Sequence, residues 1–349
     1  MHRLFGRAVA AMVGLVALQA PLAAEPVKLR VTLQSPMASH IGKNLQQFSD
    51  EVASRTKGQL AFEFFDSSQL YRDDEAVQAV ATGKIEMGVV LLNQFAEQIP
   101  AVDIFQQPFM FNYDSLVKAA TNPDREIRQL IDKAILKATG TRVLWWQAYG
   151  STVLFSKGRD ATSPDRFANT KVRTFGRTVS EFTQHCGGTP LIVSATKQRD
   201  AVKDGTVDMA MTGISGVQVR ELWQVTDTIT RTENAAMEFL VYINEGVWQR
   251  LNDEQRQIIG EVARKVEAEL RDSFIGVEAD AYTFAREKGM KVLELTPDQV
   301  VQWRACSAPV LENFMANSGD LGRQLMMAYA KLRADPCCNA GPAGAFSLR

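Results

Sequence analysis

The sequence is poor in the residues on which most enzymatic and metal chemistry depends. It has three histidines and four cysteines in 349 residues, and His2 lies within the first 24 residues. The other two histidines, His40 and His185, leave little from which to build a metal site or a catalytic triad. The sequence also has no CxxC pair, P-loop, GxGxxG or HExxH pattern, which disfavours zinc, thioredoxin-like and nucleotide chemistry. We therefore expect no catalytic residue, no cofactor and no metal.

Three local patterns have simpler structural explanations. Residues 213–216 (GISG) are one residue short of the G-x-S-x-G elbow of hydrolases. Cys186 follows His185 directly, and neighbouring side chains usually point to different faces, so we do not expect a nucleophile and its base here. Residues 73–75 (DDE) offer oxygens to a cation, but three acids also suit the first turn of a helix. The pairing of the four cysteines stays open, because the sequence alone does not fix it.

Hydropathy and charge indicate where the protein works. No apolar run reaches the roughly 20 residues that a membrane span needs. Residues 8–20 are apolar, follow Arg3 and Arg7, and lead into small residues before Glu25. This is the layout of a secretory signal peptide over residues 1–24, with an uncleaved anchor helix as the alternative. Its removal leaves 37 of the 39 basic residues against 40 acidic ones, a net charge of −3. Such a weakly acidic exported protein is not expected to bind nucleic acid.

The remaining chain alternates between strand and helix patterns. Strand patterns at 27–33, 60–65 and 85–92 are separated by helical patterns at 42–56 and 73–82. This order predicts a parallel sheet with right-handed crossovers. A second unit of the same kind follows, so the sequence predicts an α/β protein with two similar units.

A helical pattern of unusual length covers residues 245–288. The average helix has only about 11 or 12 residues. A helix of this length is able to bridge the two units and to serve as the backbone of a hinge between them.

The most informative stretch is 163–175. Pro164 and Asp165 mark a turn, and the residues from 171 to 175 then alternate, so that Arg173 and Phe175 share one face of a strand. An arginine on a strand that enters a cleft gives a carboxylate a planar, permanently charged partner. Taken alone, however, an arginine on a strand is more often solvated.

Several short motifs occur together in a characteristic order. They lie at residues 58–65, 68–70, 83–87, 107–111, 163–175, 187–190, 205–208 and 251–255. In this order, over residues 27–315, the chain resembles the DctP-type extracytoplasmic solute-binding subunits of tripartite ATP-independent periplasmic (TRAP) transporters. The resemblance implies a two-lobed α/β periplasmic binding protein of the Venus-flytrap type, with a long helix spanning both lobes. It also implies that Arg173 clamps the carboxylate of an organic anion.

The resemblance suggests a division of the chain into two lobes. The expected parts are a signal peptide (1–24), a first lobe (25–148 and 235–280), a second lobe (149–234 and 281–335) and a weakly ordered tail (336–349). The tail is expected to be weakly ordered because it is rich in proline, glycine and alanine.

Other candidate site residues lie at the ends of predicted strands, where ligands of α/β sheets tend to bind. They are Gln34, Asn93, Gln94, Thr212 and Gly213, for some of which a turn or capping role is the alternative. Trp146 either stacks on a ligand or lies in the core. Thr152 falls where many relatives carry a second arginine, so this pocket is expected to be less cationic than theirs.

The expected ligand is therefore a monocarboxylate, such as an oxo-, hydroxy- or aromatic acid, with a dicarboxylate as the alternative. The expected mechanism is capture by lobe closure and delivery to TRAP membrane subunits, by a monomer in the periplasm. A sensor that presents its ligand to a receptor and a secreted hydrolase are the rival classes.

Overall fold

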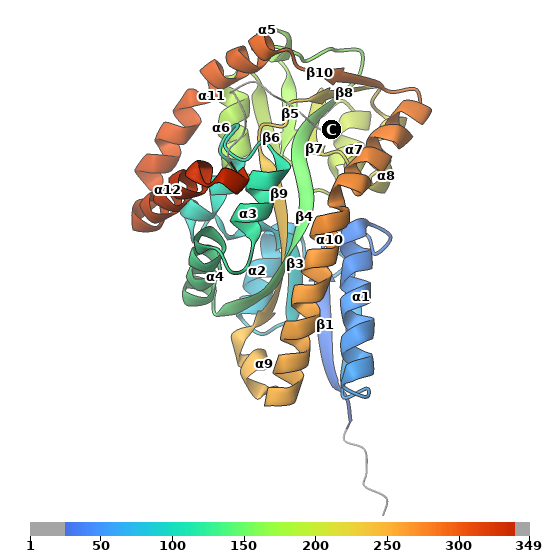
Figure 1. The fold of residues 1–349 in the computed structure, drawn as a ribbon. Coiled ribbons are helices and arrows are strands. Elements are labelled where there is room, and N and C mark those ends of the chain that lie inside the picture. Colours follow the sequence, from blue (N-terminus) through green and yellow to red (C-terminus); the bar gives the residue numbers. More distant parts are fainter. Residues whose placement is uncertain (1–24, 339–349) are drawn as a thin grey trace, which may run out of the picture.

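The computed structural model describes residues 25–338, which form a mixed α/β fold (Figure 1). The predicted signal peptide and residues 339–349 of the predicted tail lie outside the described residues. The strands are β1 (Val27–Leu33), β2 (Leu60–Phe65), β3 (Met87–Leu91), β4 (Thr141–Ser156), β5 (Lys171–Thr174), β6 (Thr189–Ile192), β7 (Met209–Gly213), β8 (Thr228–Arg231), β9 (Ala236–Asn244) and β10 (Lys291–Glu294). The predicted α/β class is confirmed.

The helices cover both ends and both faces of these strands. They are α1 (His40–Arg55), α2 (Asp73–Ala81), α3 (Asp114–Thr121), α4 (Glu126–Thr139), α5 (Pro164–Phe167), α6 (Arg177–His185), α7 (Gln198–Lys203), α8 (Gly216–Val219), α9 (Glu245–Arg250), α10 (Asp253–Glu287), α11 (Pro297–Asn317) and α12 (Gly319–Ala334). Short 3-10 helices are η1 (Leu92–Phe95), η2 (Pro100–Gln106), η3 (Leu222–Gln224) and η4 (Pro336–Cys338).

Two groups of strands meet at the long strand β4. In the first group, β1 pairs in parallel with β2 and β3, as the alternating sequence predicts, and β3 pairs antiparallel with β9. In the second group, β5 pairs in parallel with β6 and β7. The first part of β4, up to Ser151, pairs with β9, and the part from Thr152 onward pairs with β7. β4 and β9 therefore carry the chain across the junction of the two groups.

An irregularity marks this crossing. The register between β4 and β9 shifts between Ala148 and Gly150, and Gly150 has a φ of +86°. An L side chain is strained in that conformation, and a Cβ at this position would overlap with the carboxylate of Glu278 on α10. Glycine is therefore needed at this register shift, where Glu278 and Phe274 of α10 pack against β4.

The long helical pattern forms two helices instead of one. The expected helix over 245–288 is interrupted between α9 and α10, because Leu251 is extended and Asn252 caps the second helix. The Asn252 side chain accepts a hydrogen bond from the backbone N–H of Gln255, whose own side chain accepts one from the N–H of Asn252. α10 packs on α1 and β4 and farther along on α8 and β10, so it runs along both groups of strands (Figure 1). No helix within residues 25–338 has the length and apolar character needed to cross a membrane.

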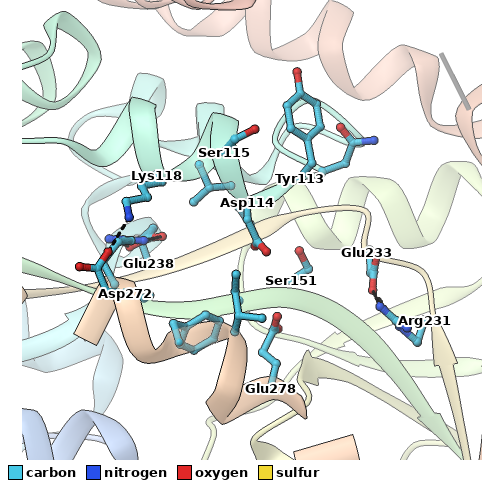
Figure 2. A pocket seen from close by; sticks show the side chains of 18 of the residues that line it. Tyr113, Asp114, Ser115, Lys118, Ser151, Arg231, Glu233, Glu238, Asp272 and Glu278 are labelled. Carbon is cyan, nitrogen blue, oxygen red and sulfur yellow. Dashed lines mark hydrogen bonds and ion pairs between the residues drawn. The ribbon is translucent and has the colours of Figure 1, made fainter. Parts of the chain in front are cut away.

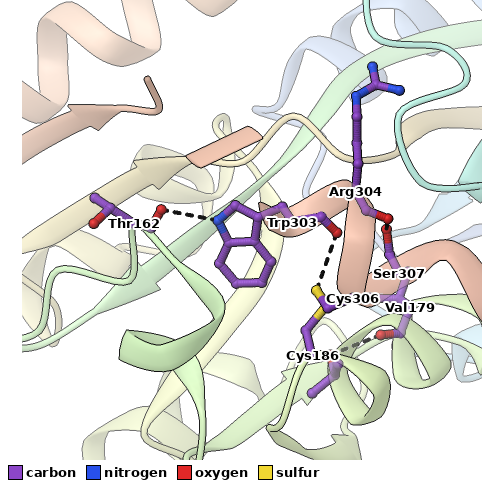
Figure 3. Close-up of a disulfide and its surroundings, with 8 residues drawn as sticks. Thr162, Val179, Cys186, Trp303, Arg304, Cys306 and Ser307 are labelled. Atoms are coloured by element: carbon purple, nitrogen blue, oxygen red, sulfur yellow. Dashed lines mark hydrogen bonds between the residues drawn. A yellow bond between two sulfur atoms is a disulfide. The ribbon is translucent and has the colours of Figure 1, made fainter. Parts of the chain in front are cut away.

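A disulfide joins Cys186, at the end of α6, to Cys306 on α11 (Figure 3). Next to it, Trp303 is fully buried and packs on the rings of Phe167 and Phe182, with centroids 5.2 and 5.5 Å away. The bond and the aromatic cluster fix α11 against α5 and α6, which accompany the second group of strands.

The last helices return to the first group. α11 contacts both α6 and η2, and α12 packs on η2, α3 and α4. Leu325 and Ala328 of α12 are buried in the same hydrophobic cluster as Phe105 of η2. α12 thus packs on elements that precede residue 149, although the sequence-based division placed residues 281–335 in the second lobe. The turn η4 follows, and the Tyr113 hydroxyl donates a hydrogen bond to the carbonyl of Cys338 (2.9 Å), so the start of the predicted tail packs on α3.

Candidate ligand-binding site

Arg173 lies at the carboxyl end of β5, between β6 and β7. It is only 2% exposed. Its Nε donates to the carbonyl oxygen of Val193 (2.8 Å), and its Nη1 donates to the carbonyl oxygen of Met211 (3.0 Å). Main-chain carbonyls just after β6 and within β7 thus hold one side of the guanidinium, and Nη2 makes no hydrogen bond within residues 25–338.

The charge of Arg173 is not balanced by an ion pair. No carboxylate within residues 25–338 lies within salt-bridge distance of its guanidinium. Burial lowers the pKa of Arg173 to about 10, Asp73 favours the charged form, and the neighbouring Arg220 opposes it. A buried cation without a partner is costly, and an anionic ligand would supply the missing charge.

Arg220 is a second cation at this site, and sequence reasoning missed it. It follows the short helix α8, and its Nη2 donates to the carbonyl oxygen of Gln34 (2.7 Å). Burial also lowers its pKa. The expectation of a less cationic pocket rested on Thr152, which replaces the second arginine of many relatives. The comparison with the relatives' pockets stays a prediction, but a different element does bring a second arginine to this pocket.

We call the space around these two side chains the arginine cavity. Its volume is about 20 Å³. It is lined by Gln34, Ser35, Asp73, Leu91, Gln94, Tyr149, Arg173, Phe175, Ala195, Gln198, Thr212, Arg220, Met237 and Phe239. Five of the predicted residues meet here: Gln34, Gln94, Arg173, Phe175 and Thr212. The expected neighbourhood of Arg173 and Phe175 is also observed, since the guanidinium carbon lies 5.6 Å from the centre of the Phe175 ring.

Two other predicted residues lie beside the cavity without lining it. The Asn93 amide donates to the carbonyl oxygen of Phe175 (2.8 Å) and so positions the backbone next to the cavity. Gly213 ends β7, and a Cβ at this position would come within 2.7 Å of the Tyr149 ring. The absence of a side chain at Gly213 therefore leaves room for Tyr149, which does line the cavity.

Thr152 and Trp146 do not reach the cavity. The hydroxyl of Thr152 donates to the side-chain oxygen of Asn234 (2.8 Å) and ties β4 to the segment before β9. Trp146 is fully buried in the core, where its indole N–H donates to Asp132 (2.9 Å) and the guanidinium of Arg128 lies over its ring. Of the two roles considered for Trp146, the core role is the observed one, because its side chain points to the opposite face of β4 from Tyr149.

An aromatic and amide wall lines the cavity, and Tyr149, Phe239 and Gln198 of this wall were not predicted from the sequence. Tyr149 packs on Phe239 at 4.8 Å and on His40 at 5.3 Å between ring centroids. The side-chain oxygens of Gln34 and Gln198 are buried without a hydrogen-bond partner among the described residues. Buried amides of this kind are available to a ligand, and rotation lets each present either its oxygen or its NH2 group.

Contacts between the two groups of strands close this site. Besides the hydrogen bond from Asn93 to Phe175, the Thr178 hydroxyl of α6 donates to Asp103 of η2 (2.7 Å). Burial raises the pKa of Asp103 to about 6. Ligand pockets usually measure about 300–1,000 Å³, so the arginine cavity must widen before an organic anion can enter. These two contacts and the hydrogen bond from Arg220 to Gln34 are among those that must separate.

Comparisons with known proteins identify the fold. The chain is 22% identical over 330 residues to the C4-dicarboxylate-binding periplasmic protein DctP of Rhodobacter capsulatus, covering 91% of this chain and 95% of that protein. A solved structure of DctP7, a Bordetella pertussis extracytoplasmic solute receptor binding pyroglutamic acid, has a TM-score of 0.82 at 21% identity, over 87% of this chain and 99% of that one. A TRAP periplasmic solute-binding protein of Sulfurospirillum deleyianum with bound succinate has a TM-score of 0.81 at 20% identity, over 89% and 99%.

The architecture is therefore that of a two-lobed periplasmic binding protein. The DctP family, described as bacterial extracellular solute-binding protein family 7, matches residues 33–318. The chain belongs to this family, which confirms the family resemblance of the sequence motifs.

Proposed function

We propose that the protein is the extracytoplasmic solute-binding subunit of a TRAP transporter and that Arg173 clamps the carboxylate of a small organic acid. The observation that best supports this proposal is the buried guanidinium of Arg173. Two main-chain carbonyls hold it in place, and it has no ion-pair partner within residues 25–338. Its free Nη2 is available for a charge-assisted hydrogen bond to a carboxylate oxygen. Membership of the solute-binding family supports the same role.

The proposed ligand is a monocarboxylate with an apolar or aromatic body, such as an oxo-, hydroxy- or aromatic acid. Phe175, Tyr149 and Phe239 supply an apolar wall beside Arg173, and the relative from Bordetella pertussis binds pyroglutamic acid. Arg220 favours a dicarboxylate as a second candidate, because it adds a cation to the same cavity. The relative from Sulfurospirillum deleyianum binds succinate.

The mechanism follows from the contacts across the site. In the open form the two lobes separate at the contacts of Asn93 and Asp103, and the acid pairs with Arg173. Closure then restores these contacts around the ligand, driven by the ligand's preference for the closed state. We further propose that the protein acts as a monomer in the periplasm and that TRAP membrane subunits receive the loaded form.

The test is thermal stability of the mature protein against a panel of mono- and dicarboxylates, because a ligand of the folded state raises the melting temperature. We expect one small group of acids to raise it. Arg173→Ala is expected to weaken binding of those acids by about 100-fold or more, because it removes charge-assisted hydrogen bonds of about 1.5–3 kcal/mol each.

Arg166→Ala is the matched control, since Arg166 is exposed on the same lobe and its loss changes the net charge equally. Equal loss of affinity in both variants, or acid binding that survives Arg173→Ala unchanged, would contradict the clamp. Turnover of an acid by the purified protein would favour an enzyme instead.

A further inference from the structure

A second and much larger cavity lies on the other side of the crossing strands. Its volume is about 480 Å³, within the range of small-molecule sites. We call it the carboxylate cavity. Its walls come from α3, from β4 and β9 at their crossing, from the segment after β8, from α10 and from the end of β10 (Figure 2). None of its lining residues belongs to the arginine cavity.

The same two strands form a wall of both cavities. Ala148 and Gly150 of β4 line the carboxylate cavity, whereas Tyr149 between them lines the arginine cavity. Likewise Glu238 of β9 faces the carboxylate cavity, and Phe239 faces the arginine cavity. Successive residues of a strand point to opposite faces, so the crossing strands separate two chemically different spaces.

Most charged groups of the carboxylate cavity are already paired. Arg271 forms two hydrogen bonds with Glu238 (2.7 and 2.8 Å), and Lys118 pairs with Asp272. Arg231 pairs with two acids of the same cavity wall, which lie after β8 and at the end of β10. These pairs use every lysine and arginine that lines the cavity.

Two carboxylates are left without an ion pair among the described residues. They are Asp114, at the start of α3, and Glu278, on α10, which point toward one another from opposite walls (Figure 2). Burial and the neighbouring charges of Asp114 and Glu233 raise the pKa of Glu278 to about 8, although a Ser151 backbone N–H and Arg231 favour its charged form. Burial likewise raises the pKa of Asp114, against the influence of Arg271. Glu278 therefore holds a proton at neutral pH, and a cation between the two groups would take the place of that proton and favour the ionised form.

The remaining lining suits the body of an organic molecule. Phe274 and Ile275 of α10 and Leu295 after β10 are apolar, and Ser115 and Ser151 offer hydroxyl groups. The aromatic face of Phe274 also attracts cations. A cavity of this volume with an apolar floor is larger than a bare metal ion needs.

We propose that the carboxylate cavity binds a small organic cation, whose ammonium group lies between Asp114 and Glu278. The site is separate from the arginine cavity and carries the opposite charge. It goes beyond the proposed capture of an organic acid and does not depend on it.

The test titrates the full-length mature protein with 1,4-diaminobutane and with ethanolamine, following the melting temperature and the heat of binding. Butane-1,4-diol is the neutral control of matched length, and calcium chloride tests a bare cation. We expect both amines to bind, and the paired change Asp114→Asn with Glu278→Gln to weaken them by about 10-fold or more. Both substitutions keep the size of the side chain and the hydrogen-bonding oxygen.

Two further variants make the result specific. Asp272→Asn removes one exposed acid of the same wall, which already pairs with Lys118, whereas the paired change removes two. It should leave amine binding almost unchanged. Arg173→Ala should also leave it unchanged, which separates this proposal from the proposed acid site. Binding of the diol as strong as that of the diamine, response to calcium alone, no amine binding, or amine binding that survives the paired change would each overturn the proposal.

Discussion

The arginine cavity and the carboxylate cavity share two strands and differ in every other respect. The first is small and holds two arginines that lack acidic partners among residues 25–338, and the second is large and holds two carboxylates that lack basic partners in the same range. In the carboxylate cavity, the remaining charged side chains are paired within the protein. The comparison teaches that a charged side chain in a cavity indicates a ligand only when no group of the protein already pairs with it.

The largest expected effect comes from breaking a charge pair in the carboxylate cavity. Glu238 is 1% exposed at its side chain and binds Arg271 through two hydrogen bonds. Glu238→Ala leaves the mostly buried Arg271 without a partner and should lower the free energy of unfolding by about 3–5 kcal/mol. Urea denaturation measures this difference. If Glu238→Ala lowers the free energy of unfolding no more than the loss of an exposed pair such as Lys118 and Asp272 does, burial of the Glu238–Arg271 pair does not increase its contribution to stability.

Removing an unpaired carboxylate should have the opposite sign. The pKa of Glu278 is raised from 4.5 to about 8 in the folded protein, so its contribution to stability is present below pH 4.5 and is lost as the pH rises through 8. Gln cannot ionise, so Glu278→Gln should be more stable than the parent protein by on the order of 2 kcal/mol at pH 9. The two proteins should converge near pH 5, and parallel stability profiles between pH 5 and 9 would contradict the pKa shift.

In the arginine cavity, the shape of the cation should matter as well as its charge. Arg173→Lys keeps the positive charge but replaces the planar fork, which Val193 and Met211 hold through Nε and Nη1. We expect acid binding to weaken by about 10-fold. Calorimetric titration with the best acid of the panel checks this, and full affinity in the variant would show that charge alone is enough.

The smallest expected effect separates the two ligand candidates. Arg220 is held by the carbonyl of Gln34, and a monocarboxylate paired with Arg173 has no second anionic group for it. Arg220→Ala should weaken a monocarboxylate by only about 3-fold, but a dicarboxylate by about 10-fold or more. A uniform loss for both classes would mean that Arg220 acts through the general potential of the cavity.

The sequence predicted those features that a local pattern carries. The alternation around Arg173 places it at the end of β5, and the order of strands and helices predicts the α/β fold. The break before α10 was also readable, since Asn252 and Gln255 form a capping box three residues apart. The expectation of one continuous helix was wrong because the helical periodicity continues across the cap, where Leu251 is extended and Asn252 begins a new helix.

The rest depends on contacts between distant segments. Arg220 follows a four-residue helix and has no motif around it, so only the folded chain brings it to Arg173. Trp146 and Tyr149 are three residues apart on β4 and so face opposite sides, but only the packing of the folded chain shows which side is the core and which is the cavity. Asp114 and Glu278 are 164 positions apart, and no sequence pattern indicates that they lie opposite each other.

The disulfide between Cys186 and Cys306 makes the stability of the fold depend on the compartment in which the chain lies. It closes a loop with a sequence separation of 120 residues, and such a cross-link stabilises a fold by roughly 4–5 kcal/mol in the chain-entropy account. Disulfides persist in oxidising compartments and are rare in the cytosol. If the protein is exported as we propose, the newly made chain lacks this stabilisation in the cytosol, where it must stay unfolded for secretion. It gains the stabilisation only after it has crossed the membrane.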